Sequence, residues 1–240
     1  TAICITRENM VLCGKDFANE VLIQIDNSIE IKWNYNDSDY IKANEIIFEL
    51  YGNARNILTA ERSMLNFIQM LSATTTTTHY YASLIAKYPA KLLDTRKTIP
   101  CFRLAQKYAV RCGGGYNHRI GLFDAYLIKE NHIRSAGGIA EAITKAKHNN
   151  PSKTVEVEVT NLIELQESID NNADIVMLDN FHIDDIYKAV EISKGKILLE
   201  VSGNVDDKTI VKIAETGVDF ISSGAITKNI KAIDLSMQVK

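Results

Sequence analysis

The spacing of hydrophobic and polar positions changes near Tyr88. Before this point, short runs of β-branched and aromatic residues bounded by turn residues predict strands at residues 2–6, 10–13, 29–35 and 45–52, with a helix at 17–25. Residues 54–87 then carry apolar positions at helical spacing. Because consecutive β-branched residues disfavour a helix interior, we predict two helices that meet at Thr74–Thr78, with threonine hydroxyls available to cap a helix or face a ligand.

From Lys91 onward, short apolar runs alternate with helical segments. The runs that predict strands are residues 91–95, 125–129, 155–159, 174–179, 196–201 and 218–223. Helical patterns such as residues 139–148 and 207–216 separate them. Alternation of this kind predicts parallel strands joined by right-handed crossovers.

Each predicted strand of this second part ends on polar residues. These are Asp94, Lys129, Glu158, Asp179, Ser202 with Gly203, and Ser223 with Gly224. A β/α barrel gathers its active site at the carboxyl ends of its strands, whereas an open doubly wound sheet uses only the loops near its switch point. Six polar strand ends therefore favour a barrel. Gly113–Gly115 matches neither phosphate-loop fingerprint, and we predict a close-approach turn there.

Positive charge is concentrated in residues 94–134. This segment holds eight Lys or Arg against three Asp or Glu, while the rest of the chain holds nineteen against twenty-seven. The cations lie beside glycines, prolines and strand ends rather than in helical pairs. Together with a net charge of only −3, this pattern favours a pocket for small anions over a long nucleic-acid groove.

Length and composition are those of an ordinary globular chain. With 240 residues, 46% hydrophobic and 24% charged, it is long enough for one barrel or two unequal domains. No apolar run reaches the roughly 18 residues that span a bilayer, so we expect no membrane partner. Cys4, Cys13, Cys101 and Cys112 form no CxxC pair, which predicts reduced thiols in a cytoplasm, with Cys101 and Cys112 serving as small hydrophobic residues.

Seven strings, in order along nearly the whole chain, carry a family resemblance. They are LTAERSMLN (58–66), DTRKTIP (94–100), KYAVRCGGGYNHRIGLFDAYLIKENH (107–132), VEVEV (155–159), ADIVMLDNF (173–181), EVSGN (200–204) and ETGVDFISSGAIT (215–227). The chain resembles quinolinate phosphoribosyltransferase, the carboxylating nicotinate-nucleotide pyrophosphorylase. This resemblance implies an N-terminal open-faced α/β sandwich, which we set at residues 1–88, and an incomplete β/α (TIM-like) barrel at 89–240 whose C-terminal tail packs back on the first domain.

The resemblance also implies a homodimer with shared active sites. Its reaction converts quinolinate and phosphoribosyl pyrophosphate to nicotinate mononucleotide, pyrophosphate and CO₂ in de novo NAD biosynthesis, with Mg²⁺ as cofactor. Both substrates are anions, which accounts for the cationic segment. The implied mechanism is N-ribosylation followed by decarboxylation, and no side chain of the chain is required as a covalent nucleophile.

A basic pocket is implied residue by residue. Arg96, His118, Arg119 and Lys129 match positions that bind quinolinate, and Lys97 matches a catalytic position that serves chiefly the phosphoribosyl donor. Arginine can hold a carboxylate bidentately, whereas lysine offers a compact charge. A histidine such as His118, taken alone, would more often have a structural role, but its place in the Asn117-His118-Arg119 string after three glycines favours a functional one.

Arg62 matches an arginine that the family contributes across the dimer interface to the partner's site. The alternative from the residues alone is a helix-surface salt bridge with Glu61 or another neighbour.

Glu158 and Asp179 match the family's catalytic acidic pair, which helps to hold Mg²⁺ against the donor. Hard cations take oxygen ligands, often through few carboxylates. Glu156 shares a strand face with Glu158 because strand side chains alternate with a period of two. The alternative for these carboxylates is a structural salt bridge to a neighbouring barrel lysine.

The remaining matches concern phosphate. Ser202, Gly203, Asn204, Ser223 and Gly224 match loops whose backbone N–H groups cradle the 5-phosphate, and Arg7 matches a residue that reaches a phosphate. Asn204 replaces the usual family glycine; asparagine tolerates positive φ, so we expect the loop to keep its shape. Ala73 also replaces a common glycine, and the family's leading helical segment would precede Thr1.

Two other functions fit the same residues. One is an enzyme of the same fold that acts on another pyridine or pyrimidine acid, such as nicotinate, although several pocket cations favour a dianion. The other is a catalytically silent, anion-binding homologue of the molybdate-transport-associated type.

Overall fold

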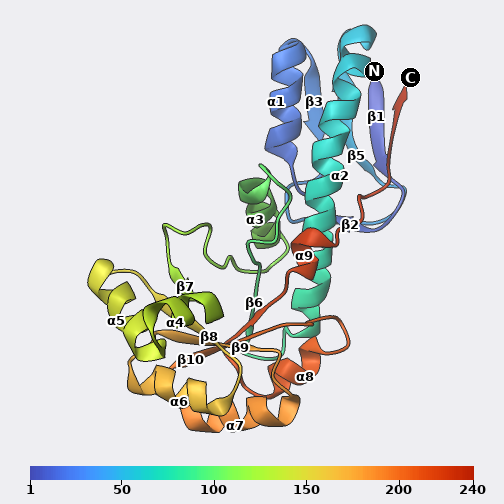
Figure 1. The fold of residues 1–240 in the computed structure, drawn as a ribbon. Coiled ribbons are helices and arrows are strands. Elements are labelled where there is room, and N and C mark those ends of the chain that lie inside the picture. Colours follow the sequence, from blue (N-terminus) through green and yellow to red (C-terminus); the bar gives the residue numbers. More distant parts are fainter. The chain divides into compact units, whose positions relative to one another are not determined.

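A computed structural model of the chain describes residues 1–240 (Figure 1). The chain forms two compact units, and each is made of separate segments. Unit 1 comprises Thr1–Tyr80, Ile99–Gly115 and Ile226–Lys240, and unit 2 comprises Tyr81–Thr98 and Tyr116–Ala225. A single boundary after residue 88 does not describe this division, because two later segments return to unit 1.

Unit 1 is built on an antiparallel sheet in the order β12-β1-β5-β3. The strands are β1 (Ala2–Thr6), β3 (Glu30–Trp33), β5 (Ile46–Tyr51) and β12 (Leu235–Val239), and a separate pair is formed by β2 (Met10–Val11) and β4 (Tyr40–Ile41). In the register of the sheet, Cys4 of β1 lies opposite Phe48 of β5 and Met237 of β12. This pairing returns the C-terminal tail to the N-terminal part of the chain.

Two helices pack on this sheet, α1 (Lys15–Ile25) and α2 (Ala54–Leu84) (Figure 1). Residues of β1 alternate between buried and partly buried, so one face of the sheet meets the core. Leu22 of α1 and Met64 of α2 join Phe48 of β5 in that core. A sheet with helices packed on one face is an open-faced α/β sandwich, which is what the family resemblance implies for this part of the chain.

Helix α2 runs without a break through Thr74–Thr78, so the predicted division into two helices is wrong. The Thr75 and Thr78 hydroxyls donate to the carbonyls of Leu71 (3.0 Å) and Thr74 (2.7 Å), one turn earlier. Both threonines are fully buried. Because the buried hydroxyls find acceptors on their own helix, packing overrides the weak intrinsic helix preference of threonine. These two hydroxyls are engaged by the protein rather than offered to a ligand.

Helix α3 (Arg103–Cys112) belongs to unit 1 and ends at the three glycines. A Cβ atom placed on Gly113 would lie 2.5 Å from the Thr75 carbonyl oxygen, and one on Gly115 would lie 2.8 Å from the Thr78 side chain. The predicted close-approach turn is therefore confirmed. The short helix α9 (Ala225–Lys228) follows the last strand of unit 2.

Unit 2 is built on six parallel strands in the order β6-β11-β10-β9-β8-β7. They are β6 (Lys91–Leu93), β7 (Tyr126–Ile128), β8 (Val155–Val159), β9 (Ile175–Asp179), β10 (Leu198–Ser202) and β11 (Phe220–Ser222). All six predicted strands are confirmed, and so is their parallel direction. The order is that of a barrel, but β6 and β7 are not paired with each other, so the barrel is incomplete, as predicted.

The helices of unit 2 alternate with its strands. They are α4 (Glu130–Ala136), α5 (Ile139–Asn149), α6 (Leu162–Asp170), α7 (Ile183–Ser193) and α8 (Ile210–Glu215). Helix α5 packs on β7 and β8, α6 on β8, α7 on β10 and α8 on β11. The Asn161 side chain caps α6 by accepting hydrogen bonds from the backbone N–H groups of Ile163 and Glu164.

None of the helices combines the length and the hydrophobicity that crossing a membrane requires.

Candidate active site

The carboxyl ends of the parallel strands collect most of the predicted site residues in unit 2. Lys129 directly follows β7, Glu158 lies in β8, Asp179 ends β9, Ser202 ends β10 and Ser223 follows β11. Only Arg7 and Arg62 belong to unit 1. Arg7 donates to the Ser236 hydroxyl (3.2 Å), while Arg62 is exposed on α2 and forms no ion pair with Glu61.

The acidic pair lies in a network of charges. Lys129 Nζ forms an ion pair with Glu158 Oε2, which is the contact expected of a strand carboxylate beside a barrel lysine. Burial raises the pKa of Asp179, the charge of Glu158 raises it further, and Lys129 and Lys97 oppose both effects. Lys97, Lys129 and Glu158 are far from Asp179 in the sequence, but in the fold their charges all affect this carboxyl group. Two neighbouring carboxylates fit the oxygen-ligand chemistry of a divalent cation such as Mg²⁺.

Two guanidinium groups also lie near each other. Burial lowers the pKa of Arg119, and the positive charge of Arg96 lowers it further. Arg119 Nη1 donates to the Ala125 carbonyl (3.2 Å), and Asp124 accepts the N–H of Ile120 (2.6 Å), so the loop after Arg119 is folded on itself. Because like charges repel, a paired arginine site is stabilised by an anion.

Asp94, at the end of β6, holds the turn that precedes Arg119. It is fully buried, and its two oxygens accept hydrogen bonds from the backbone N–H of His118 (2.8 Å) and from Asn117 Nδ2 (2.7 Å). The carboxylate thus places the Asn117-His118-Arg119 string at the edge of the sheet where Lys129 and Asp179 also lie.

His118 has protein partners at both ring nitrogens. Nδ1 accepts the backbone N–H of Arg119 (2.7 Å), and Nε2 lies 2.9 Å from Glu156 Oε2 and 3.4 Å from Glu200 Oε2. An imidazole that accepts at Nδ1 and donates at Nε2 is the neutral tautomer. In this geometry His118 orients Arg119 and leaves no ring nitrogen for a ligand.

Glu200 and Glu156 are both buried in the barrel interior, with 1% and 3% of their surface exposed. Burial raises the pKa of Glu200 to about 8, and the neighbouring charge of Glu156 contributes. Oε1 of each glutamate has no hydrogen-bond partner. The buried site therefore favours the protonated form of Glu200 at neutral pH.

Replacing Glu200 with glutamine should change how stability depends on pH. A carboxyl whose pKa is higher in the folded than in the unfolded state contributes stability that is lost as pH rises, here from about 4.5 through about 8. We expect Glu200→Gln to gain stability relative to the parent between pH 5 and pH 9, by on the order of 1–3 kcal/mol. Urea unfolding at both pH values measures this difference.

The exposed Glu191 of α7 provides the control, since Glu191→Gln should leave the pH dependence as in the parent. If the free energy of unfolding of the parent and of Glu200→Gln changes with pH in the same way, the pKa of Glu200 is not raised in the folded protein.

Left-handed backbone shapes the turns after β9 and β10. Asn180, Gly203 and Asn204 have φ angles of 56°, 97° and 49°. The expectation that Asn204 keeps the positive φ of this loop is confirmed. A Cβ atom on Gly203 would lie only 2.2 Å from Asn180 Oδ1, so another residue at position 203 would displace the Asn180 side chain and would also adopt a strained positive φ.

Asn180 is a site residue that the sequence reasoning missed. Its side-chain nitrogen donates to Asp179 Oδ2 (2.9 Å), and its side-chain oxygen accepts from Asn204 Nδ2 (3.2 Å). It therefore connects the acidic pair to the predicted phosphate loop. The only signal in the sequence is its place directly after the strand-end Asp179.

Ser223 supports the last turn rather than facing outward. It is buried, its hydroxyl donates to the Val205 carbonyl (3.2 Å), and its oxygen accepts the Ala225 N–H (3.3 Å). Gly224, between these contacts, is partly exposed. The Ser223 N–H also donates to the Leu93 carbonyl (3.1 Å), so protein contacts fix the shape of this turn.

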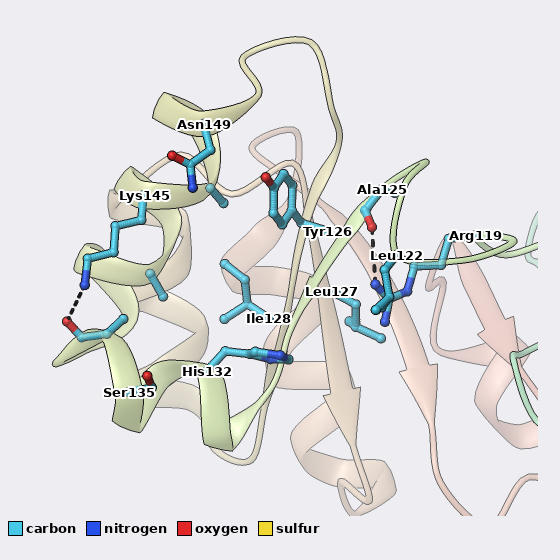
Figure 2. Close-up of a pocket in the computed structure, with 13 residues that line it drawn as sticks. Arg119, Leu122, Ala125, Tyr126, Leu127, Ile128, His132, Ser135, Lys145 and Asn149 are labelled. Atoms are coloured by element: carbon cyan, nitrogen blue, oxygen red, sulfur yellow. Dashed lines mark hydrogen bonds between the residues drawn. The ribbon is translucent and has the colours of Figure 1, made fainter.

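A cavity of about 390 Å³ lies beside β7, between this strand and helices α4 and α5 (Figure 2). Figure 2 shows Tyr126, Ile128, His132 and Arg119 among the residues that line it. The lining includes neither Glu158 nor Asp179. This cavity is therefore separate from the acidic pair.

The fold and the charges define a class of protein, an incomplete β/α barrel whose strand ends combine clustered cations with a carboxylate pair. The chain belongs to the quinolinate phosphoribosyl transferase family: the model of the family's N-terminal domain matches residues 1–72, and that of its C-terminal domain matches residues 73–238.

Individual relatives agree. A probable nicotinate-nucleotide pyrophosphorylase [carboxylating] from Synechocystis is 40% identical over 98% of this chain and 81% of its own length. The structure of the nicotinate-nucleotide pyrophosphorylase from Francisella tularensis matches with a TM-score of 0.98 and 69% identity, over 100% of this chain and 85% of that one. NadC from Streptococcus pyogenes matches with a TM-score of 0.96 and 37% identity, over 99% of this chain and 85% of that one.

Proposed function

We propose that this protein transfers the phosphoribosyl group of phosphoribosyl pyrophosphate to quinolinate with decarboxylation, giving nicotinate mononucleotide, pyrophosphate and CO₂ in de novo NAD biosynthesis. The names of the family and of relatives of which this chain spans 81% and 85% support the proposal. The observation that carries it is that cations lie at the carboxyl ends of the strands, where Arg96 is near Arg119 and Lys129 directly follows β7. Several cations at one place suit a dianion such as quinolinate better than nicotinate, which carries one charge.

We assign quinolinate to Arg96, Arg119 and Lys129, with His118 as a residue that positions Arg119. The planar fork of an arginine can grip a carboxylate through two hydrogen bonds, and a lysine ammonium can neutralise the second carboxylate. The contact of His118 Nδ1 with the Arg119 N–H supports the positioning role. Lys129 would have to exchange its contact with Glu158 for the substrate when quinolinate binds.

We assign the donor to the other charged residues. Glu158 and Asp179 would hold Mg²⁺, which neutralises pyrophosphate charge when bound, and the raised pKa of Asp179 near Glu158 supports a cation there. Lys97 would contact the donor's phosphates. Backbone N–H groups of the turns at Ser202–Asn204 and Ser223–Gly224 would cradle the 5-phosphate. Arg7 would reach a phosphate as well.

Catalysis in this proposal rests on positioning and electrostatics. The pyridine nitrogen attacks the anomeric carbon as pyrophosphate leaves, through an oxocarbenium-like state, and the fixed cations stabilise the charge of the leaving group. The resulting pyridinium withdraws electrons from the 2-carboxylate and favours loss of CO₂. Arg119 and Lys129 hold the ring in place through both steps.

We further propose a homodimer in which Arg62 completes the partner subunit's site, in a cytoplasmic setting. The exposed position of Arg62 on α2, without an ion pair to Glu61, supports a role toward another chain. The four cysteines are all free thiols, which suits a reducing compartment.

Release of labelled CO₂ tests the proposed reaction. The protein, incubated with carboxyl-labelled quinolinate, phosphoribosyl pyrophosphate and Mg²⁺, should release CO₂ and form nicotinate mononucleotide in equal amounts. Arg119→Ala should raise the KM for quinolinate roughly tenfold to a hundredfold, because a charge-assisted contact is worth about 1.5–3 kcal/mol.

Arg134 provides the control, because it forms an exposed ion pair with Glu130 on α4 and Arg134→Ala should leave KM unchanged. Product formation from nicotinate without CO₂ release would instead identify an enzyme for a monocarboxylate. Binding of quinolinate without any product would identify a silent anion-binding homologue.

A further inference from the structure

Two cysteines that the proposed reaction does not use lie together in unit 1. The Sγ atoms of Cys13 and Cys112 and a carboxylate oxygen of Asp37 are all within 4.8 Å of one another. Cys13 follows β2 and is fully buried, whereas Cys112 is the last residue of α3 and is partly exposed. A small oxidant in solution can therefore reach Cys112, while Cys13 lies directly behind it.

The two thiols differ in their chemistry. Hydrogen bonds from the Cys13 thiol and the Ser38 hydroxyl lower the pKa of Cys112 to about 6, while burial and the negative charge of Asp37 oppose this shift. Hydrogen bonding to Cys112 and burial raise the pKa of Cys13. Of the two sulfurs, the accessible Cys112 therefore has the greater thiolate character, and the thiolate is the form that reacts with oxidants, while the buried Cys13 favours the protonated form.

The surrounding contacts hold Cys13 and Asp37 in place. The Cys13 backbone exchanges hydrogen bonds with the Ser72 hydroxyl, as N–H donor (3.0 Å) and carbonyl acceptor (3.2 Å). Asp37 accepts from the N–H groups of Gly14 (3.2 Å) and Lys15 (3.3 Å) and from the Tyr108 hydroxyl (2.9 Å). Both Asp37 oxygens are thus engaged by donors, so the carboxylate supports the loop and is poorly available as a metal ligand.

The Cys112 side chain can make the movement that a disulfide bond with Cys13 requires. A disulfide needs its two sulfurs about 2.05 Å apart, so one of them must move. Cys112 is the last residue of α3 and partly exposed, and rotation about its Cα–Cβ bond moves the sulfur without moving the buried partner.

We propose that Cys13 and Cys112 are a redox-sensitive dithiol that hydroperoxides convert to an intrachain disulfide. The Cys112 thiolate attacks a peroxide oxygen, the O–O bond breaks, and the second oxygen leaves as water or an alcohol after taking a proton. Cys112 is then a sulfenic acid. The Cys13 sulfur attacks the Cys112 sulfur, the S–O bond breaks, and the hydroxyl leaves as water with the Cys13 proton. Two thiols are oxidised by one peroxide, which is reduced.

The sequence predicts that Cys101 and Cys112 serve as small hydrophobic residues. Cys101 is instead exposed, and it does not belong to the cluster of Cys13, Asp37 and Cys112. It therefore provides a matched internal control, an accessible thiol without a partner. Cys4, buried in the sheet of unit 1, provides an inaccessible one.

To test this, the native protein is treated with hydrogen peroxide and its remaining thiols are blocked. Disulfides are then mapped by non-reducing peptide mass spectrometry. The Cys13–Cys112 linkage should exceed every other disulfide at least tenfold and should be reversed by dithiothreitol. Cys13→Ser should instead accumulate a Cys112 sulfenic acid that dimedone traps, and Cys112→Ser should form neither product. Both variants should keep the turnover of the reduced parent, because neither residue belongs to the proposed site.

Two results would overturn the proposal. One is the absence of the Cys13–Cys112 peptide while Cys101 is oxidised, which would mean that the two sulfurs do not meet. The other is a stoichiometric metal ion that protects both thiols from peroxide in the native protein, which would make the cluster a metal site.

Discussion

Mixed dimers of Arg62→Ala and Lys129→Ala chains should regain activity that neither variant has alone. Lys129 lies at the carboxyl end of β7 in unit 2, and Arg62 is exposed on α2 in unit 1. If Arg62 completes the partner subunit's site, a mixed dimer carries both changes in one site and neither in the other. Complete statistical exchange should then restore about a quarter of parental turnover, since half of the dimers are mixed and each has one intact site.

The matched control mixes Lys129→Ala with Glu158→Gln. These residues form an ion pair within one chain, so every mixed dimer has damage in both sites and should stay inactive. Dimer exchange is followed by native mass spectrometry of differently tagged chains. Mixed Arg62→Ala and Lys129→Ala dimers without activity would place Arg62 in its own subunit's site or outside any site.

Asp179→Asn should separate turnover from quinolinate binding. The change keeps the size of the side chain and removes a negative charge from a pocket assigned to an anionic substrate. We therefore expect quinolinate affinity, measured by calorimetry, to stay the same or increase. Turnover should fall at least about a hundredfold and its Mg²⁺ dependence should shift, because the pyrophosphate leaving group loses the cation positioned for it.

Asp184→Asn is the control, since Asp184 is an exposed carboxylate at the start of α7, shortly after Asp179. Asp184→Asn should change neither the affinity for quinolinate nor the turnover. An Asp179→Asn protein with parental turnover and an unchanged Mg²⁺ profile would show that this carboxylate only balances the neighbouring lysines.

Local patterns were enough to predict the parallel strands and their functional edge. The barrel strands are short and largely apolar, and such runs can be recognised in sequence because both faces of a parallel sheet are covered and most of its positions are removed from water. The polar residue at each end marks where the strand leaves the core. The positive φ of Asn204 was predictable for a similar reason, since asparagine is among the few residues that accept it without large strain.

The domain boundary and the threonine run could not be predicted in the same way. Helix propensity is a local quantity, and it is outweighed in α2 because the Thr75 and Thr78 hydroxyls are buried and hydrogen-bonded to the preceding turn. Likewise, α3 returns to unit 1 through contacts with residues far away in the chain, and the return of β12 was expected only from the family resemblance. No local window contains both partners of such a contact.

The sequence by itself determined the types of element, the edge of the sheet that carries the charges, and, through the resemblance, the family. Only the tertiary structure decided which side chains act on one another. It places Glu200 against Glu156 and His118, Asn180 between Asp179 and Asn204, and Cys13 beside Cys112. These pairings set protonation and reactivity, because electrostatic and hydrogen-bond energies depend on distance and burial, which a linear order of residues does not contain.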